Sequence, residues 1–119
     1  AGLSPASADN PDKICRPFDL WRTTGVIGEG ACMMVLEPEA SHRLGYAIIS
    51  GYASASDSSN GVGSGMLLAI KGALANANLD PNGVDLVNAW GPGHKEIDAS
   101  EARVLSKRPA GDLQLMHCC

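Results

Sequence analysis

The stretch VDLVNAWGPGHKEIDASEARVL, residues 84–105, contains the clearest succession of elements in this chain. Val84, Leu86 and Val87 make a short apolar, partly β-branched run that predicts a buried strand, which Asn88 and Ala89 end. Gly91–Gly93 interrupts both helix and strand, so the backbone must turn there. From His94 to Leu105, apolar residues recur at helical spacing and predict a helix. Because such a strand-to-helix turn presents side chains at the edge of a sheet, we expect a functional site here.

This stretch resembles the histidine loop of β-ketoacyl-ACP synthases, whose motif reads N-A-H-G-T-x-T-x-x-x-D-x-x-E. The matching residues are Asn88, Ala89, Gly91, Asp98 and Glu101. Trp90 stands at the position of the family's catalytic histidine, and Pro92 and His94 stand at the positions of its threonines. The resemblance therefore implies that this chain keeps the residues that shape the loop but lacks the catalytic imidazole. We interpret His94 as an exposed residue in the first turn of the helix.

A second stretch, CRPFDLWRTTGVIGEGACMMVLEPEA at residues 15–40, carries the same resemblance. β-Ketoacyl synthases have R-P-F-D-x-x-R-x-G-F-V-x-G-E-G-A, followed by an apolar strand that ends in L-E. The residues that match in order and spacing are 16–19, 22, 26, 28–31 and 35–37. Agreement this dense is far more specific than a single glycine motif.

The physical properties of this second stretch predict two polar contacts. Asp19 and Arg22 are near enough in sequence to pair across a turn. Glu29 lies between two glycines that permit close approach of the backbone, so we expect it in a buried turn. An unpaired buried carboxylate is unfavourable, so Arg16 or Arg22 is its expected partner. We interpret Glu29 as part of a structural ion pair rather than as a catalytic group.

The rest of the chain is predicted to alternate strands, helices and turns. Cys32–Leu36 predicts a central strand buried on both faces, with Cys32 as a small buried hydrophobe. The other predicted elements are a short helix at 38–44, a strand at 46–54, a loop at 54–65, a helix at 66–79 and a turn at 80–83.

The resemblance implies an α/β fold, a partial thiolase-like fold with a small mixed sheet of three or four strands and two or three packed helices. We expect residues 1–15 to form a loop or arm and residues 16–105 to form a partial ketosynthase-like domain. Residues 106–119 are expected to be a tail unrelated to the family, which either adds an edge strand or stays disordered.

Composition excludes several other classes of function. The formal net charge is -4 and there is no basic run, so nucleic acid is not an expected partner. No apolar stretch is long enough to span a bilayer, and we expect a cytoplasmic protein. The four cysteines fit neither a disulfide framework nor a C-x-x-C zinc site, so no metal and no cofactor is expected.

The resemblance implies acyl condensation in fatty acid or polyketide biosynthesis, but this chain carries no confident catalytic residue. None of its cysteines lies in a D-T-A-C-S-like context. We therefore expect a fragment that is inactive alone. The alternatives are a non-catalytic, chain-length-factor-like partner of an active ketosynthase, or a degenerate remnant. The expected partners are acyl carrier protein or an intact ketosynthase subunit, and exposed sheet edges leave homo-oligomerisation open. The residues expected to line a pocket or support it are Glu29, Asn88, Trp90, Gly91, Asp98 and Glu101.

Overall fold

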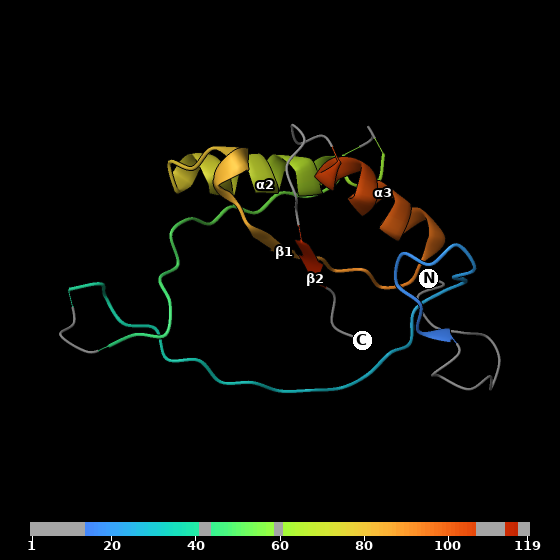
Figure 1. Ribbon diagram of the computed structural model, residues 1–119, viewed down its shortest axis with the longest axis horizontal. Helices are drawn as coiled ribbons and strands as arrows, with labels where there is room; N and C mark the ends of the chain where they lie inside the picture. The colour runs from blue at the N-terminus through green and yellow to red at the C-terminus, as the bar shows by residue number, and fades with distance from the viewer. Residues whose placement is uncertain (1–13, 41–43, 59–60, 107–113, 117–119) are drawn as a thin grey trace.

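The computed structural model describes residues 14–40, 44–58, 61–106 and 114–116 (Figure 1). Its elements in chain order are helix α2 (Ser64–Asn76), the 3-10 turn η1 (Pro81–Gly83), strand β1 (Leu86–Asn88), helix α3 (Lys95–Leu105) and strand β2 (Gln114–Met116). β1 and β2 pair in parallel, with Leu86 opposite Gln114 and Asn88 opposite Met116. The described residues therefore combine helices with a parallel two-stranded sheet.

Helix α2 confirms the helix predicted at 66–79, although it begins and ends earlier. It ends at Asn76 because Asn78 adopts a left-handed backbone conformation, with a φ of 52°. The N–H of Leu79 then donates to the carbonyl of Leu74, which satisfies one of the last free carbonyls of the helix. The predicted turn at 80–83 is confirmed as η1, where the Asp80 carboxylate accepts a hydrogen bond from the N–H of Asn82.

The predicted strand, turn and helix at 84–105 are also present. Helix α3 starts one residue after His94 and ends at Leu105. β1 is shorter than predicted and is not buried in this structure, since Leu86 is 47% exposed. β2 belongs to the segment 106–119 and pairs with β1, so the edge-strand alternative for that segment is the one observed. Residues 107–113 and 117–119 lie outside the described residues.

Two predicted strands are absent from the described residues. Residues 32–36 form no strand and Met33 is 97% exposed, so the prediction of a central buried strand is wrong for this structure. Cys32 is likewise exposed rather than buried. Residues 46–54 form no strand either. Among the described residues neither segment has a neighbouring strand to bond with, and a strand forms only when its backbone groups are paired.

The helix predicted at 38–44 is not observed in its described part, where residues 39 and 40 form a turn. Residues 41–43 lie outside the described residues. The loop predicted at 54–65 is confirmed up to the start of α2 at Ser64 for those of its residues that the structure describes.

Hydrophobic burial is sparse in the described part of the chain. Ile14 and Ala89 are its buried hydrophobic residues, whereas the buried polar residues are Asp98, Ser100 and Glu101. The radius of gyration is 16.8 Å, compared with roughly 13.5 Å for a compact domain of this length. Figure 1 shows why: residues 26–40 and 44–50 circle away from the helices, and residues 51–56 then return to contact α2. Polar contacts around α3, rather than a hydrophobic core, therefore hold the described residues together.

Candidate functional site

The carboxylate of Glu101 holds the turn between β1 and α3 by accepting hydrogen bonds from the backbone of that turn. Its two carboxylate oxygens accept hydrogen bonds from the N–H groups of Trp90 and Gly91, each at 2.8 Å. Glu101 is 4% exposed, so these charge-assisted bonds form away from solvent. Gly91 has a φ of 46°, and a Cβ there would lie 2.8 Å from the Phe18 ring. This turn therefore requires glycine at 91 and an acceptor at 101.

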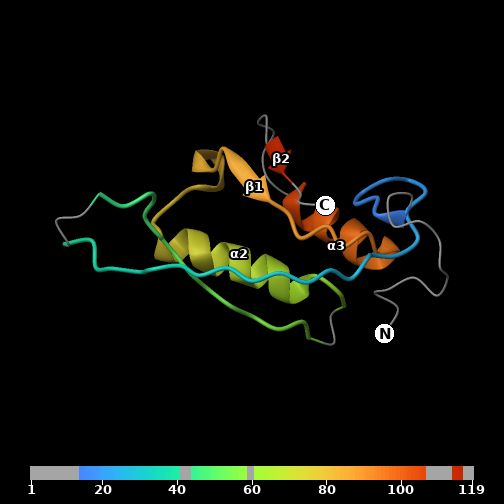
Figure 2. The ribbon, with the colours of Figure 1, turned by 90° about the horizontal axis from the view of Figure 1, so that it is seen from below.

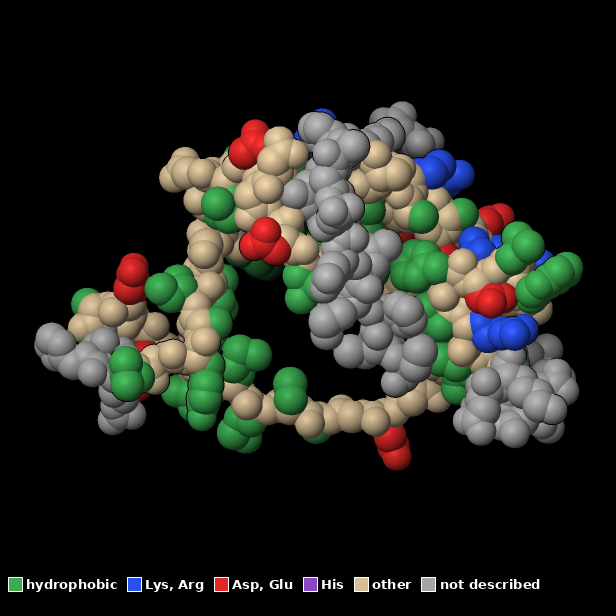
Figure 3. Space-filling view, in the orientation of Figure 1, with side chains coloured by type: hydrophobic (Ala, Val, Ile, Leu, Met, Phe, Trp, Pro, Cys, Tyr) green, Lys and Arg blue, Asp and Glu red, His purple; other side chains and the backbone are tan. Residues whose placement is uncertain are grey.

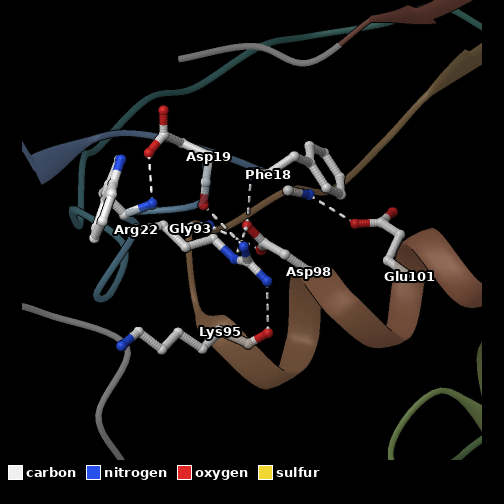
Figure 4. A network of polar contacts seen from close by, with 9 residues as sticks. Phe18, Asp19, Arg22, Gly93, Lys95, Asp98 and Glu101 are labelled. Atoms are coloured by element: carbon white, nitrogen blue, oxygen red, sulfur yellow. Dashed lines mark hydrogen bonds and ion pairs between the residues drawn. The ribbon is translucent and has the colours of Figure 1, made fainter.

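Asp98 is the most buried polar side chain of the described residues, with no exposed surface. One of its oxygens accepts from the N–H of Gly93 at 3.0 Å, and the other accepts from the N–H of Phe18 at 2.9 Å. The second oxygen also lies 3.2 Å from Nε of Arg22. Figure 4 shows the carboxylates of Asp98 and Glu101 on the side of α3 that faces the turn. Glu101 thus holds the start of the turn, at Trp90 and Gly91, and Asp98 holds its end, at Gly93.

Arg22 connects the loop at 16–22 to the start of α3. Besides its ion pair with Asp98, it donates to the backbone carbonyls of Asp19 at 2.8 Å and Lys95 at 2.9 Å. The predicted pairing of Asp19 with Arg22 therefore runs through the carbonyl of Asp19. The Asp19 carboxylate accepts instead from the N–H of Trp21 at 2.7 Å.

Glu29 does not lie in a buried turn, which corrects the expectation from the sequence. It is exposed, and the guanidinium of Arg22 is at Asp98. A Cβ added at Gly28 or Gly30 would meet nothing within 4 Å, so the expected close approach of backbone segments is absent here. The structure thus brings Gly91, Asp98 and Glu101 together and places Glu29 apart from them.

Asn88 and Trp90 flank the buried Ala89 at the end of β1, and both are exposed. The Trp90 side chain is 58% exposed, although its backbone N–H is held by Glu101. His94, expected on the surface, is half-buried, and its Nδ1 is buried without a hydrogen-bond partner among the described residues. The structure thus fixes the backbone at residue 90 and leaves more than half of Trp90 exposed.

Comparison with known proteins assigns this chain to a family. Residues 46–113 match the family model described as "Beta-ketoacyl synthase, C-terminal domain". The chain belongs to the β-ketoacyl synthase family. The resemblance carried by the sequence motifs is therefore confirmed, and with it the α/β, thiolase-like class of fold.

The relatives of this family member come from polyketide and fatty acid biosynthesis. The chain is 41% identical over 113 residues to the granaticin polyketide putative β-ketoacyl synthase 1 of Streptomyces violaceoruber, an alignment that covers 87% of this chain and 27% of that protein. It is 37% identical over 109 residues to the actinorhodin polyketide putative β-ketoacyl synthase 2 of Streptomyces coelicolor, covering 86% and 27%.

A mitochondrial 3-oxoacyl-(acyl-carrier-protein) synthase of Arabidopsis thaliana is 38% identical over 112 residues, covering 87% of this chain and 24% of that protein. The chain thus spans about a quarter of the length of the curated relatives it matches. No solved structure matches it.

Asp57 has a structural role in this β-ketoacyl synthase chain that the sequence reasoning missed. Its carboxylate accepts hydrogen bonds from the N–H groups of Gly63, at 3.1 Å, and Gly65, at 2.7 Å. These bonds lower the pKa of Asp57 below its ordinary value of 3.8. Asp57 thereby caps α2 from outside the helix, because Gly63 at the N-cap has no side chain to do so. A glycine at the helix start with an aspartate shortly before it was the available signal.

The described residues contain no group of three or more metal-ligating side chains that could hold a metal ion. Of the four cysteines, Cys15 is half-buried and Cys32 is exposed. Within the ranges that the structure describes, no helix is both long and apolar enough to cross a membrane.

Proposed function

We propose that this chain contributes scaffold from the C-terminal part of a β-ketoacyl synthase and does not catalyse condensation by itself. The observation that supports this most is the pair of hydrogen bonds from Trp90 and Gly91 to Glu101. They hold the turn that bears the family's catalytic position, and that position carries an indole. The hydrogen bonds that position the turn are therefore present, although Trp90 replaces the catalytic histidine that the family carries there.

The chemistry of condensation explains why this replacement matters. Decarboxylative condensation needs a thiolate to hold the acyl chain and imidazoles to stabilise the enolate and the developing oxyanion. The indole of Trp90 offers one N–H donor and cannot exchange a proton near neutral pH. His94 stands at a threonine position of the motif, and its Nδ1 is buried. It therefore does not take over the role of the missing imidazole.

We also propose that the complete fold contains the small mixed sheet of three or four strands expected from the resemblance. In that fold, residues 32–36 and 46–54 join β1 and β2. Their apolar, partly β-branched side chains, which are exposed here, support this proposal. Acyl carrier protein as partner and a cytoplasmic location rest on the resemblance alone.

An acyl-transfer assay tests the proposed lack of activity. The protein is incubated with radiolabelled acyl-acyl carrier protein and analysed by intact mass spectrometry, with the granaticin relative as positive control. We expect no covalent acyl-enzyme. Labelled acyl chain retained as a thioester on any cysteine of this chain would contradict the proposal.

A second candidate is a non-catalytic, chain-length-factor-like partner of an active ketosynthase. The 58% exposure of Trp90 favours it, because a bulky apolar side chain at the former catalytic position is available to fill or shape a partner's cavity. Co-purification with an intact ketosynthase supports this candidate. A remnant without activity or partner is the third reading, and neither assay would then give a signal.

A further inference from the structure

The turn formed by residues 16–19 places an aromatic residue where glycine is usual. The N–H of Asp19 donates to the carbonyl of Arg16 at 3.1 Å, which closes a turn with Pro17 second and Phe18 third. The φ of Phe18 is 59°, in the left-handed region. A turn with a positive φ at its third residue normally carries glycine or asparagine there, because a left-handed backbone is unfavourable for a bulky side chain. Contacts made by Phe18 must therefore offset this strain.

Two contacts of Phe18 supply this compensation, and both reach the region of the turn between β1 and α3. The N–H of Phe18 donates to the buried carboxylate of Asp98 at 2.9 Å, which is a charge-assisted hydrogen bond. The ring of Phe18 lies against Gly91, since a Cβ at Gly91 would lie 2.8 Å from Cε2 and 3.3 Å from Cζ of the ring. The missing side chain of Gly91 thus leaves the space that the Phe18 ring takes.

These contacts lie in the packed end of the molecule. Figures 1 and 2 both show the loop at 16–22 beside the start of α3. In Figure 3 this end, at the right, is several side chains thick, whereas the arm that leaves it is a single chain thick. Figure 4 shows the Phe18 ring beside the chain that the Glu101 carboxylate reaches from α3. Gly91, whose N–H donates to Glu101, is therefore held from two sides.

We propose that Phe18 is a positioning residue for position 90: its ring and the carboxylate of Glu101 hold Gly91 between them, and this fixes the backbone that carries the side chain of residue 90. The left-handed conformation directs the ring at Gly91 while the N–H of Phe18 reaches Asp98. An apolar residue that only added buried surface would not need such a backbone, because the same side chain can be buried without strain. A local preference broken in this way is typical of a functional position.

The test measures hydrogen exchange of single amides by NMR in the full chain and in Phe18→Gly. Glycine adopts the φ of 59° without strain, so the amide of Asp19 should keep its exchange rate. The amides of Trp90 and Gly91 should exchange at least about tenfold faster, because the ring no longer holds the turn. The amides of Ala77 and Leu79, which are hydrogen-bonded at the end of α2, report on overall stability and should change little.

Two further variants separate the ring from other properties of residue 18. Phe18→Leu keeps an apolar side chain and loses the flat ring, and we expect it to accelerate the amides of Trp90 and Gly91 as well. Leu20→Gly removes an apolar side chain that is 80% exposed in the same loop, and we expect it to leave these two amides unchanged. Equal acceleration of Trp90, Gly91, Ala77 and Leu79 in Phe18→Gly would overturn the proposal, and so would the same local acceleration in Leu20→Gly.

A double-mutant cycle tests the contact between the ring and Gly91 directly. Gly91→Ala places a methyl group against the ring in the wild-type background, whereas in Phe18→Gly the ring is absent and the strain of the positive φ remains. We expect Gly91→Ala to lower Tm in the Phe18→Gly background by at most about half as much as in wild type. Strictly additive decreases in Tm would show that the two positions are not coupled and would overturn the proposal.

This inference rests on the proposed function in treating residue 90 as the position that the scaffold serves. The two proposals can fail separately. Labelled acyl-enzyme in the acyl-transfer assay would contradict the proposed function and leave the exchange result at Trp90 and Gly91 standing. Unchanged exchange at these amides in Phe18→Gly would contradict the role of Phe18 alone.

Discussion

Arg22 and Asp98 form an ion pair, with Nε and Oδ2 3.2 Å apart, that joins the N-terminal loop to helix α3. The carboxylate is fully buried and the Arg22 side chain is 16% exposed, so water screens the pair little. The same carboxylate accepts from the N–H groups of Phe18 and Gly93. One side chain thus holds together the loop, the turn and the helix.

We expect Asp98→Asn to destabilise the protein by about 3 kcal/mol, because removal of one partner leaves the other charge buried without compensation. Urea unfolding followed by circular dichroism measures the loss. Asp85→Asn, which neutralises an exposed carboxylate, is the control and is expected to change stability little. Equal effects of the two variants would show that the ion pair does not organise the fold.

We expect Glu101→Gln to lower stability by about 1–3 kcal/mol. The Gln amide offers one oxygen to the two N–H groups of Trp90 and Gly91, so one of them faces an NH2 donor. Hydrogen exchange at Trp90 and Gly91 should accelerate. Glu96→Gln, at an exposed position in the first turn of the same helix, should leave those two amides unchanged.

Gly91→Ala is expected to cost about 1–3 kcal/mol, since the φ of 46° is strained for a residue with a side chain. The new methyl group would also lie 2.8 Å from the Phe18 ring. Thermal unfolding compares it with Gly30→Ala, where a Cβ meets nothing within 4 Å. If both substitutions were equally tolerated, the turn would not depend on glycine.

Asp57→Asn is expected to weaken α2 at neutral pH and to matter less in acid. Hydrogen bonds from Gly63 and Gly65 lower the pKa of Asp57 below 3.8. A carboxyl group with a depressed pKa adds stability above its unfolded pKa, and this stability is lost as the pH falls through the folded value. Unfolding measured from pH 7 to below pH 3 should show wild type and variant converging at the acid end. If the difference in stability between wild type and Asp57→Asn did not change with pH, the charge of Asp57 would not be its cause.

Sequence reasoning predicted the local elements between Met66 and Leu105 well because their signals are local. Asn78 and the Asp80–Gly83 turn end α2, and the Gly91–Gly93 turn separates β1 from α3. It failed for Cys32–Leu36 and for residues 46–54, which have the composition of strands. A strand depends on neighbours distant in sequence, and within the described residues those neighbours are missing.

The sequence by itself determined the family, the positions of α2 and α3, and the replacement of the catalytic histidine by Trp90, since each follows from residue identity and spacing. Only the tertiary structure decided which charges meet. It paired Arg22 with Asp98, left Glu29 in solvent and used Asp57 to cap α2. The reason is that a charged side chain takes the partner that the folded backbone brings within reach, and sequence distance does not show which partner that is.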